Sequence, residues 1–393
     1  MYHLSCCVCK HQFPSDKHPY VCPEHPESGN LDVELEAPSS PICERPGMFR
    51  YLPMMPLTTD AIISPLLVGD TPLVNADRIA PSLGIKSLWI KDDGRNPTGS
   101  LKDRASAFVC SKALSLGIDT IATASTGNAG AALAGIGASM NLTTKIYVPK
   151  TAPVGKLAQS LAFGADLVRV DGPYDLAFQQ CDAYCKENGC YNRNTGYNPY
   201  TVEGKKTVSF EIAEQLGGGL GSGVFAVPDW VCVSVGDGNI ITGVHKGFKD
   251  LHKFGLIDRI PKLLAVNAMG SKFVYECIAN DEDPATKKAV KVDTIADSVA
   301  AGVPADKVRA VRAVKETGGA CVVVEEQDIL VAIKDMASST GVFAEPAAAL
   351  AFAGLKYAIR DGTIGASDSV VVLSTGNGLK DVASAMKAVG GLD

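Results

Sequence analysis

The chain has 393 residues, of which 46% are hydrophobic and 20% are charged, and its formal net charge is −6. This length and composition allow a sizeable core in two or three domains and exclude wholesale disorder. Acids and bases are mixed along the chain without a basic patch, so we expect no nucleic-acid partner. Because no apolar run could span a bilayer and the N-terminus lacks a signal-peptide core, we expect no membrane partner and a cytoplasmic location.

Residues 1–40 are rich in Cys, His and Pro, and we expect them to form a separate Cys-rich N-terminal hairpin. The segments "CCVC" and "CPEH" each place two metal-ligand types three positions apart, as in the two knuckles of a zinc ribbon. The candidate zinc ligands are Cys6, Cys9, Cys22 and His25, with Cys7 as a further thiol. The alternative is a hairpin without metal. Most of the 12 cysteines lie in apolar segments further along, which indicates buried thiols in a reducing compartment.

After a Pro-rich connector, residues 65–393 alternate between short apolar runs and helix-like stretches. The runs that predict buried strands are residues 87–93, 120–125, 145–149, 166–171, 230–235, 262–268, 321–326 and 369–375. This alternation predicts parallel sheets with helices on both faces. We therefore expect an α/β fold in which two doubly wound parallel-sheet subdomains share a cleft. The smaller subdomain would span roughly residues 103–200.

Ligands of open α/β sheets bind beyond the carboxyl ends of the strands, so the residues after each strand are functional candidates. In "NPTGSLKDR", Lys102 stands at the start of a predicted helix, where its charge opposes the helix dipole. A lysine buried in a cleft loses charge stabilisation and becomes a usable amine nucleophile and base. A solvated lysine at a helix start is the alternative interpretation.

The strand at 120–125 is followed by "STGNAGAALA", a predicted strand-to-helix turn. Backbone N–H groups at a helix N-terminus, with hydroxyls beside them, form a cradle that suits a carboxylate. The residues of this turn are Ser125, Thr126, Gly127 and Asn128. Ordinary helix capping would use the same residue types and is the alternative.

Two later strand ends complete the set of candidate sites. In "VGDGN", Gly236 and Gly238 let the backbone approach a ligand closely before a helix, as in a phosphate cradle, although a plain turn is the alternative. In "STGNGLKD", the hydroxyl of Thr375 would be a neutral partner that leaves a ring nitrogen unprotonated. An amine, a carboxylate cradle, a phosphate cradle and such a hydroxyl together predict pyridoxal phosphate bound to lysine, with an amino-acid substrate beside it.

These motifs resemble those of the threonine synthase family, within the tryptophan-synthase-β-like group of fold type II pyridoxal phosphate enzymes. The resemblance runs from about residue 65 to the C-terminus and includes "GVFAEPAAALAFAGL" at 341–355. It implies that Lys102 forms the Schiff base with the cofactor, that Asn128 donates to the cofactor 3′-oxygen and that Thr375 faces the pyridine nitrogen. It also implies a phosphate loop of Gly236, Asp237, Gly238 and Asn239, and a substrate-carboxylate loop of Ser125, Thr126 and Gly127.

The resemblance implies conversion of O-phospho-L-homoserine and water to L-threonine and phosphate by a homodimer, with Lys102 as both anchor and base. Thr201, however, stands where the family often has an arginine that helps to hold the substrate phosphate. A hydroxyl cannot replace a bidentate guanidinium. The cations that could compensate are Lys205, Lys206, Arg193 and Arg104. The alternatives are a threonine/serine ammonia-lyase or another β-elimination or β-replacement enzyme, and a binding protein that kept the fold without turnover.

Overall fold

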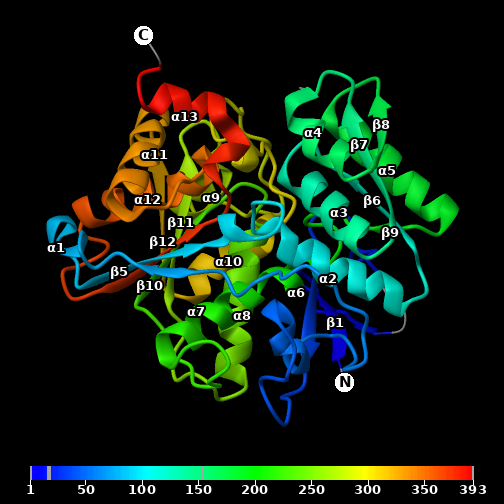
Figure 1. Ribbon diagram of the computed structural model, residues 1–393, viewed down its shortest axis with the longest axis horizontal. Helices are drawn as coiled ribbons and strands as arrows, with labels where there is room; N and C mark the ends of the chain where they lie inside the picture. Colours follow the sequence, from blue (N-terminus) through cyan, green and yellow to red (C-terminus); the bar gives the residue numbers. More distant parts are fainter. Residues whose placement is uncertain (1, 16–18, 153, 392–393) are drawn as a thin grey trace.

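The computed structural model describes residues 2–15, 19–152 and 154–391, and these residues form three sheets (Figure 1). A six-stranded sheet has the order β12-β11-β10-β13-β5-β4, and a four-stranded sheet has the order β8-β7-β6-β9. The third sheet, with the order β2-β1-β3, lies near the N-terminus. The prediction of an α/β fold with two parallel sheets is confirmed.

The large sheet is parallel except for its edge strand β4, which runs antiparallel to β5. Its strands are β4 (Leu73–Asn75), β5 (Ser87–Asp92), β10 (Trp230–Ser234), β11 (Lys262–Ala268), β12 (Ala320–Val324) and β13 (Ser369–Ser374). The α-helices of this part are α1 (Ala80–Leu83), α6 (Tyr200–Lys205), α7 (Thr207–Gly217), α8 (Asn239–Lys253), α9 (Phe273–Ala279), α10 (Lys307–Glu316), α11 (Glu326–Thr340), α12 (Pro346–Arg360) and α13 (Val382–Ala388).

Alternation along the strands gives this sheet two buried faces, as expected for parallel strands covered by helices. On one face, Val231 and Val371 belong to the core that includes α7, α8 and α10. On the other face, Cys232 and Val372 pack with α11 and α12. Short runs that are mainly apolar on both faces are what made these strands recognisable in the sequence.

The small sheet is parallel throughout and lies on the right in Figure 1. Its strands are β6 (Thr120–Ala124), β7 (Thr143–Pro149), β8 (Asp166–Val170) and β9 (Tyr191–Asn192). The accompanying helices are α2 (Lys102–Ser115), α3 (Asn128–Ser139), α4 (Val154–Ala162) and α5 (Tyr174–Asn188). All eight strands expected from the sequence are present in the two parallel sheets. The two-residue strand β9 was not predicted, because a run that short has no periodicity to detect.

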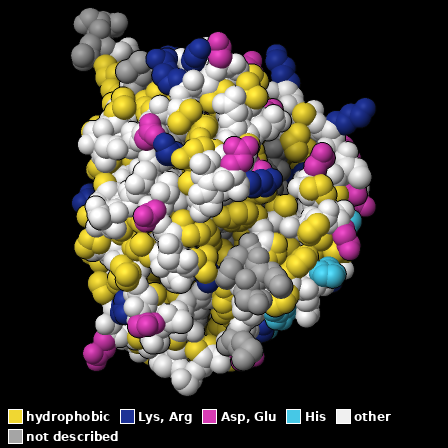
Figure 2. Space-filling model, turned by 90° about the vertical axis from the view of Figure 1, so that its right-hand side faces the viewer, with side chains coloured by type: hydrophobic (Ala, Val, Ile, Leu, Met, Phe, Trp, Pro, Cys, Tyr) yellow, Lys and Arg dark blue, Asp and Glu magenta, His cyan; other side chains and the backbone are white. Residues whose placement is uncertain are grey.

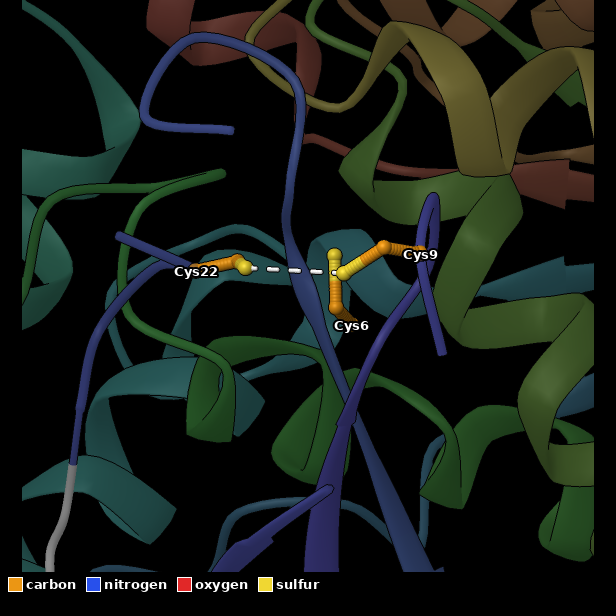
Figure 3. Close-up of side chains that lie close together, drawn as sticks. All are labelled: Cys6, Cys9 and Cys22. Atoms are coloured by element: carbon orange, nitrogen blue, oxygen red, sulfur yellow. Dashed lines mark hydrogen bonds between the residues drawn. The ribbon is translucent and has the colours of Figure 1, made fainter. Parts of the chain in front are cut away.

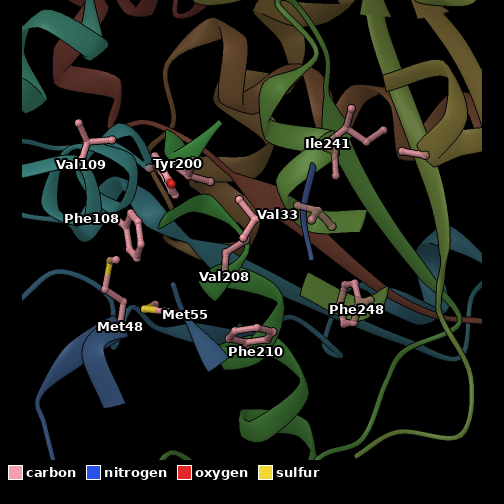
Figure 4. Close-up of a cluster of buried hydrophobic side chains, with 14 of the residues drawn as sticks. Val33, Met48, Met55, Phe108, Val109, Tyr200, Val208, Phe210, Ile241 and Phe248 are labelled. Carbon is pink, nitrogen blue, oxygen red and sulfur yellow. The ribbon is translucent and has the colours of Figure 1, made fainter. Parts of the chain in front are cut away.

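The N-terminal segment is a three-stranded antiparallel sheet rather than a simple hairpin. Its strands are β1 (Tyr2–Cys6), β2 (Gln12–Pro14) and β3 (Leu31–Leu35). Val33 of β3 is buried in the main core, in one cluster with Met48 of the 3₁₀ helix η1 (Gly47–Met54), Phe108 of α2 and Phe210 of α7 (Figure 4). The N-terminal sheet therefore shares the main hydrophobic core and is not an appendage.

The surface of the small subdomain carries acidic and basic side chains that are interspersed with apolar ones (Figure 2). Within the described ranges, no helix combines the length and apolar character needed to cross a membrane. The homodimer and the cytoplasmic location stay predictions.

Candidate active site

The Lys102 motif is joined directly to the last strand-end motif. Lys102 is the first residue of α2, at the boundary between the two parallel sheets (Figure 1). Just before it, the N–H of Leu101 donates to the carbonyl oxygen of Thr375 at 2.9 Å, and Ser100 forms an isolated bridge with Gly376. This pairing holds Lys102 and the Thr375 loop side by side, although the two residues are 273 positions apart in the sequence.

The carboxylate-cradle motif contacts a residue to which the sequence gave no role. The side-chain amide of Asn128, at the start of α3, donates to both carboxylate oxygens of Glu345, at 2.9 and 3.1 Å. Glu345 precedes α12, is 5% exposed, and its N–H donates to the carbonyl oxygen of Gly376 at 3.1 Å. Burial raises the pKa of Glu345, and the hydrogen bond from Asn128 opposes that rise. A cavity of about 230 Å³ lies beside this pair, between the two subdomains.

The loop "VGDGN" has the conformation that its two glycines allow. Gly238 precedes α8 with φ of +81°, and a Cβ on Gly236 would lie 2.4 Å from the Cα of Val299. The N–H of Asn239 donates to the carboxylate of Asp237 at 2.9 Å. The side chain of Asn239 is engaged elsewhere, because its amide donates to Asp306 at 2.9 Å. The side chain of Asn239 therefore braces the loop, and its backbone N–H would reach a ligand only by exchanging Asp237 for it.

Three cations and one acid surround this loop. Lys205 is fully buried and donates to the side-chain oxygen of Asn239. Burial lowers the pKa of Lys205, the charge of Lys102 lowers it further, and Asp237 opposes both. Burial alone would raise the pKa of Asp237, but the charges of Lys102 and Lys205 bring the pKa below its usual value. The carboxylate thus sits ionised among cations that outnumber it.

Arg193 supplies an unpaired donor in this region. Its side chain is fully buried; Nε donates to Ser106 at 3.2 Å and Nη1 donates to Thr195 at 2.6 Å. Nη2 has no partner within the described part of the chain. Burial lowers the pKa of Arg193 to about 10, and the charge of Asp237 is among the nearby ones that raise it. A buried guanidinium N–H without an acceptor costs free energy, so this geometry suits an anionic ligand.

Two of the four cations proposed to replace an arginine at position 201 are committed elsewhere. Arg104 is paired with Asp93 and Glu211, and Lys206 is paired with Glu203 and Asp250. Those two cations are structural, so Lys205 and Arg193 remain as the candidates that could replace an arginine at position 201.

The hydroxyl of Thr201 does not substitute for a guanidinium either. It donates to the carbonyl oxygen of Asn198 at 2.8 Å and lies 3.3 Å from the side-chain oxygen of Asn239. These contacts hold α6 and the phosphate loop together.

The end of β13, beside the Lys102 motif, offers hydroxyl groups. Thr375 is 8% exposed. Ser374 and Ser234, at the ends of β13 and β10, share one face of the sheet by the strand register, and both hydroxyls lack partners among the described residues. The glycine cradle and these hydroxyls fit the phosphate and ring nitrogen of pyridoxal phosphate, which leaves the unpaired guanidinium N–H of Arg193 for a second anion.

Glu345 is the site residue that the sequence analysis left without a role. It occurs in the quoted stretch "GVFAEPAAAL", where a glutamate precedes a proline at the first turn of a helix. That local signal marks a helix start. It gives no indication that the carboxylate meets Asn128, because the partner lies 217 positions earlier in the chain.

Comparisons with known proteins give relatives of this chain in sequence and in fold. The model of the family described as "Pyridoxal-phosphate dependent enzyme" matches residues 65–376. A threonine synthase of Methanosarcina acetivorans is 36% identical over 388 residues, which cover 97% of this chain and 93% of the relative. A threonine synthase of Halalkalibacterium halodurans is 35% identical over 341 residues, which cover 86% of this chain and 90% of that relative.

A solved structure of threonine deaminase isoform 2 from Solanum lycopersicum is similar in fold. The two align with a TM-score of 0.69 and 23% identity, over 91% of this chain and 96% of that one. At this identity the likeness establishes the fold of the chain and nothing about its substrate.

Proposed function

Since the chain belongs to the pyridoxal-phosphate-dependent enzymes, as a lyase of the threonine synthase type, we propose that it converts O-phospho-L-homoserine and water to L-threonine and phosphate. The observation that carries this proposal is the surplus of buried cations beside the loop "VGDGN". Among the residues that the structure describes, Arg193 keeps one N–H unpaired there, and Lys205 has one side-chain hydrogen bond, to Asn239. A substrate with its own phosphate would use these groups, whereas an uncharged side chain would not.

Each chemical step of such a reaction has a candidate group in this chain. Bound pyridoxal phosphate would supply an electron sink that makes the α-proton of an attached amino acid acidic. The amine of Lys102 would hold the cofactor aldehyde and, once displaced by the substrate amine, take the proton from the α-carbon. The N-terminus of α3, with Ser125, Thr126 and Gly127, would bind the substrate carboxylate.

The groups around the cofactor would set its orientation and charge. The backbone of Gly236, Gly238 and Asn239 at the N-terminus of α8 would bind the cofactor phosphate. The carboxylate of Asp237 would oppose the lowering of the pKa of Lys205 by burial. The hydroxyl of Thr375 would leave the ring nitrogen unprotonated.

The second candidate function is a threonine or serine ammonia-lyase. Thr201 favours it, because its hydroxyl is engaged with Asn198 and Asn239 and therefore does not replace the arginine found at this place in many threonine synthases. An ammonia-lyase would need the same lysine and cradles but no second phosphate site.

The decisive experiment supplies the purified, cofactor-loaded protein with O-phospho-L-homoserine, L-threonine and L-serine in separate reactions. Release of phosphate together with threonine from the first substrate would support the proposal. A 2-oxo acid formed from threonine or serine, without phosphate release from O-phospho-L-homoserine, would replace it with the ammonia-lyase. A protein that binds pyridoxal phosphate but turns over none of the three would contradict both.

A further inference from the structure

Three cysteine thiols of the N-terminal sheet converge outside the cofactor site. The sulfur atoms of Cys6, Cys9 and Cys22 all lie within 4.8 Å of one another, and those of Cys9 and Cys22 are 3.8 Å apart (Figure 3). Two sulfurs bound tetrahedrally to one zinc ion at about 2.3 Å lie about 3.8 Å from each other. The measured spacing is therefore that of two thiolate ligands of a single metal ion.

Two hydrogen-bonded turns aim these side chains. In the first turn, the N–H of Val8 points at the sulfur of Cys6 at 3.4 Å. In the second, the N–H of His25 donates to the carbonyl oxygen of Cys22 at 3.1 Å. Cys7 points elsewhere and donates its thiol to a backbone carbonyl at 3.2 Å. Packing of cysteines as ordinary apolar residues gives no reason for this selection, whereas metal knuckles use the first and fourth positions of such a turn.

His25 offers a fourth ligand beside one of the three thiols, that of Cys9. A ring nitrogen of His25, a carboxylate oxygen of Glu24 and the sulfur of Cys9 all lie within 4.8 Å of one another. Imidazole is the usual fourth ligand beside three thiolates. Glu24 is exposed and lies on the same turn, which makes it a matched control for His25.

A continuous path of polar contacts joins this cluster to the phosphate loop. Cys6 is paired with Leu31 across β1 and β3, and the carbonyl oxygen of Leu31 accepts from Arg309 at 2.7 Å. Arg309 donates to both carboxylate oxygens of Asp306, at 2.7 and 2.9 Å. Asp306 in turn accepts from the side-chain amide of Asn239 at 2.9 Å. A change in the position of β3 would therefore alter the position of Asn239 through Arg309 and Asp306.

We propose that Cys6, Cys9, Cys22 and His25 bind one zinc ion, and that this ion fixes the N-terminal sheet against the loop that holds the cofactor phosphate. The ion has a structural role, because four protein ligands leave no open coordination position. The second half of the proposal rests on the proposed function, since it takes the loop "VGDGN" as the cofactor-phosphate site.

The metal site is tested by metal analysis of the purified full-length protein after expression with added zinc. We expect about one zinc ion per chain in the wild type and in the Cys7→Ser and Glu24→Gln controls, and less than about one fifth of that in Cys9→Ser and His25→Ala. Cobalt(II) added to metal-depleted protein should give thiolate-to-cobalt absorption in the wild type and weaker absorption in Cys9→Ser. A metal-free wild type, a disulfide between Cys9 and Cys22, or equal zinc loss in Cys7→Ser and Cys9→Ser would overturn the assignment.

We call the fixing of the N-terminal sheet against the loop "VGDGN" the brace. It is tested by the affinity of the protein for pyridoxal phosphate, read from the visible absorption of the cofactor, before and after zinc removal. We expect roughly tenfold weaker binding in the zinc-free protein, as is typical when supporting contacts are lost. Asp32→Asn, which weakens the contacts of β3 with Arg309 and Arg312, should weaken cofactor binding while the zinc remains. Equal affinity with and without zinc would refute the brace. Failure of the zinc-loaded protein to bind the cofactor would instead contradict the proposed function, and the zinc content would still decide the metal site.

Discussion

Two buried charge clusters of this protein differ in whether their charges are balanced. In the first, which we call the closed cluster, Arg104 is paired with Asp93 at 2.6 Å and Glu211 at 2.7 Å, and Lys91 is paired with Glu211 at 2.7 Å. It has two cations and two acids, and all four side chains are fully buried. Burial would raise the pKa of Glu211, but its two cationic partners bring that pKa well below the usual range.

The second, or open, cluster contains Lys102, Lys205, Arg193 and Asp237, and the other acid beside Lys205, Asp306, is already paired with Arg309. Arg193 keeps one N–H without a partner among the described residues. A fully paired buried cluster holds a fold together, whereas an unpaired buried charge is tolerated where a ligand completes it. The difference separates two groups of buried charged residues, one structural and one available for binding an anion.

The largest expected effect concerns Lys102 of the open cluster. Lys102→Ala should reduce turnover by at least about 10³-fold, because it removes both the cofactor anchor and the base. Product release and the visible absorption of lysine-bound cofactor are the measurements, and both should be lost. Lys112→Ala, in the same helix but in contact with Tyr2, is the control that should retain turnover. Activity near the wild-type level in Lys102→Ala would remove Lys102 from the mechanism.

The closed cluster should respond in stability. Arg104→Met leaves Asp93 and the Glu211 pair without their main cation, and breaking a buried ion pair in this way costs about 3–5 kcal/mol of unfolding free energy. Urea unfolding of the purified protein measures the loss. A change below about 1 kcal/mol would mean that Arg104 is not the centre of the cluster.

The sequence could not distinguish these two clusters. Arg104, Arg193, Lys205 and Lys206 were equivalent candidates, because a lysine or an arginine in an α/β segment carries no local sign of its partner. The partner of Arg104 that decides its role is Glu211, which is 107 positions away. Side-chain pairing of this kind depends on tertiary packing, and no periodicity reports it.

Strands and strand-end loops could be predicted for a different reason. The run "WVCVSV" is apolar on both faces, and the chain that follows it carries the glycines of the phosphate loop. Burial on both faces and glycine at positive φ are local requirements, so they leave a local trace in the sequence. The contact of Asn128 with Glu345 depends on how the two subdomains meet, so it leaves no local trace in the sequence.

A third prediction separates the clusters by function. Arg193→Met should raise the KM for O-phospho-L-homoserine by about 10- to 100-fold, because a charge-assisted contact to the substrate phosphate is lost. Its unfolding free energy should stay the same or rise, since an unpaired buried charge has been removed.

Lys206→Met is the matched control for Arg193→Met. Lys206 is equally buried but paired with Glu203 and Asp250. Its loss should lower stability and leave the KM unchanged. If both variants lose stability and keep the KM, Arg193 belongs with the closed cluster.

The smallest effect is expected at the contact between the subdomains, where Glu345 accepts two hydrogen bonds from Asn128. Burial raises the pKa of Glu345 above 4.5, so the folded state binds a proton more tightly than the unfolded state. As the pH rises above 4.5, the unfolded state ionises first and the wild type loses stability until Glu345 ionises in the folded state as well. Glu345→Gln cannot ionise and should therefore avoid this loss.

Urea unfolding of Glu345→Gln and the wild type at several pH values tests this expectation. The variant should gain up to about 1 kcal/mol on the wild type between pH 4.5 and neutral pH. Glu187→Gln, which alters an exposed carboxylate, is the control and should follow the wild type. A constant difference between Glu345→Gln and the wild type at every pH would show that folding leaves the pKa of Glu345 unchanged, and at neutral pH Glu345 would then join Asp237 as a second negative charge beside the cations of the open cluster.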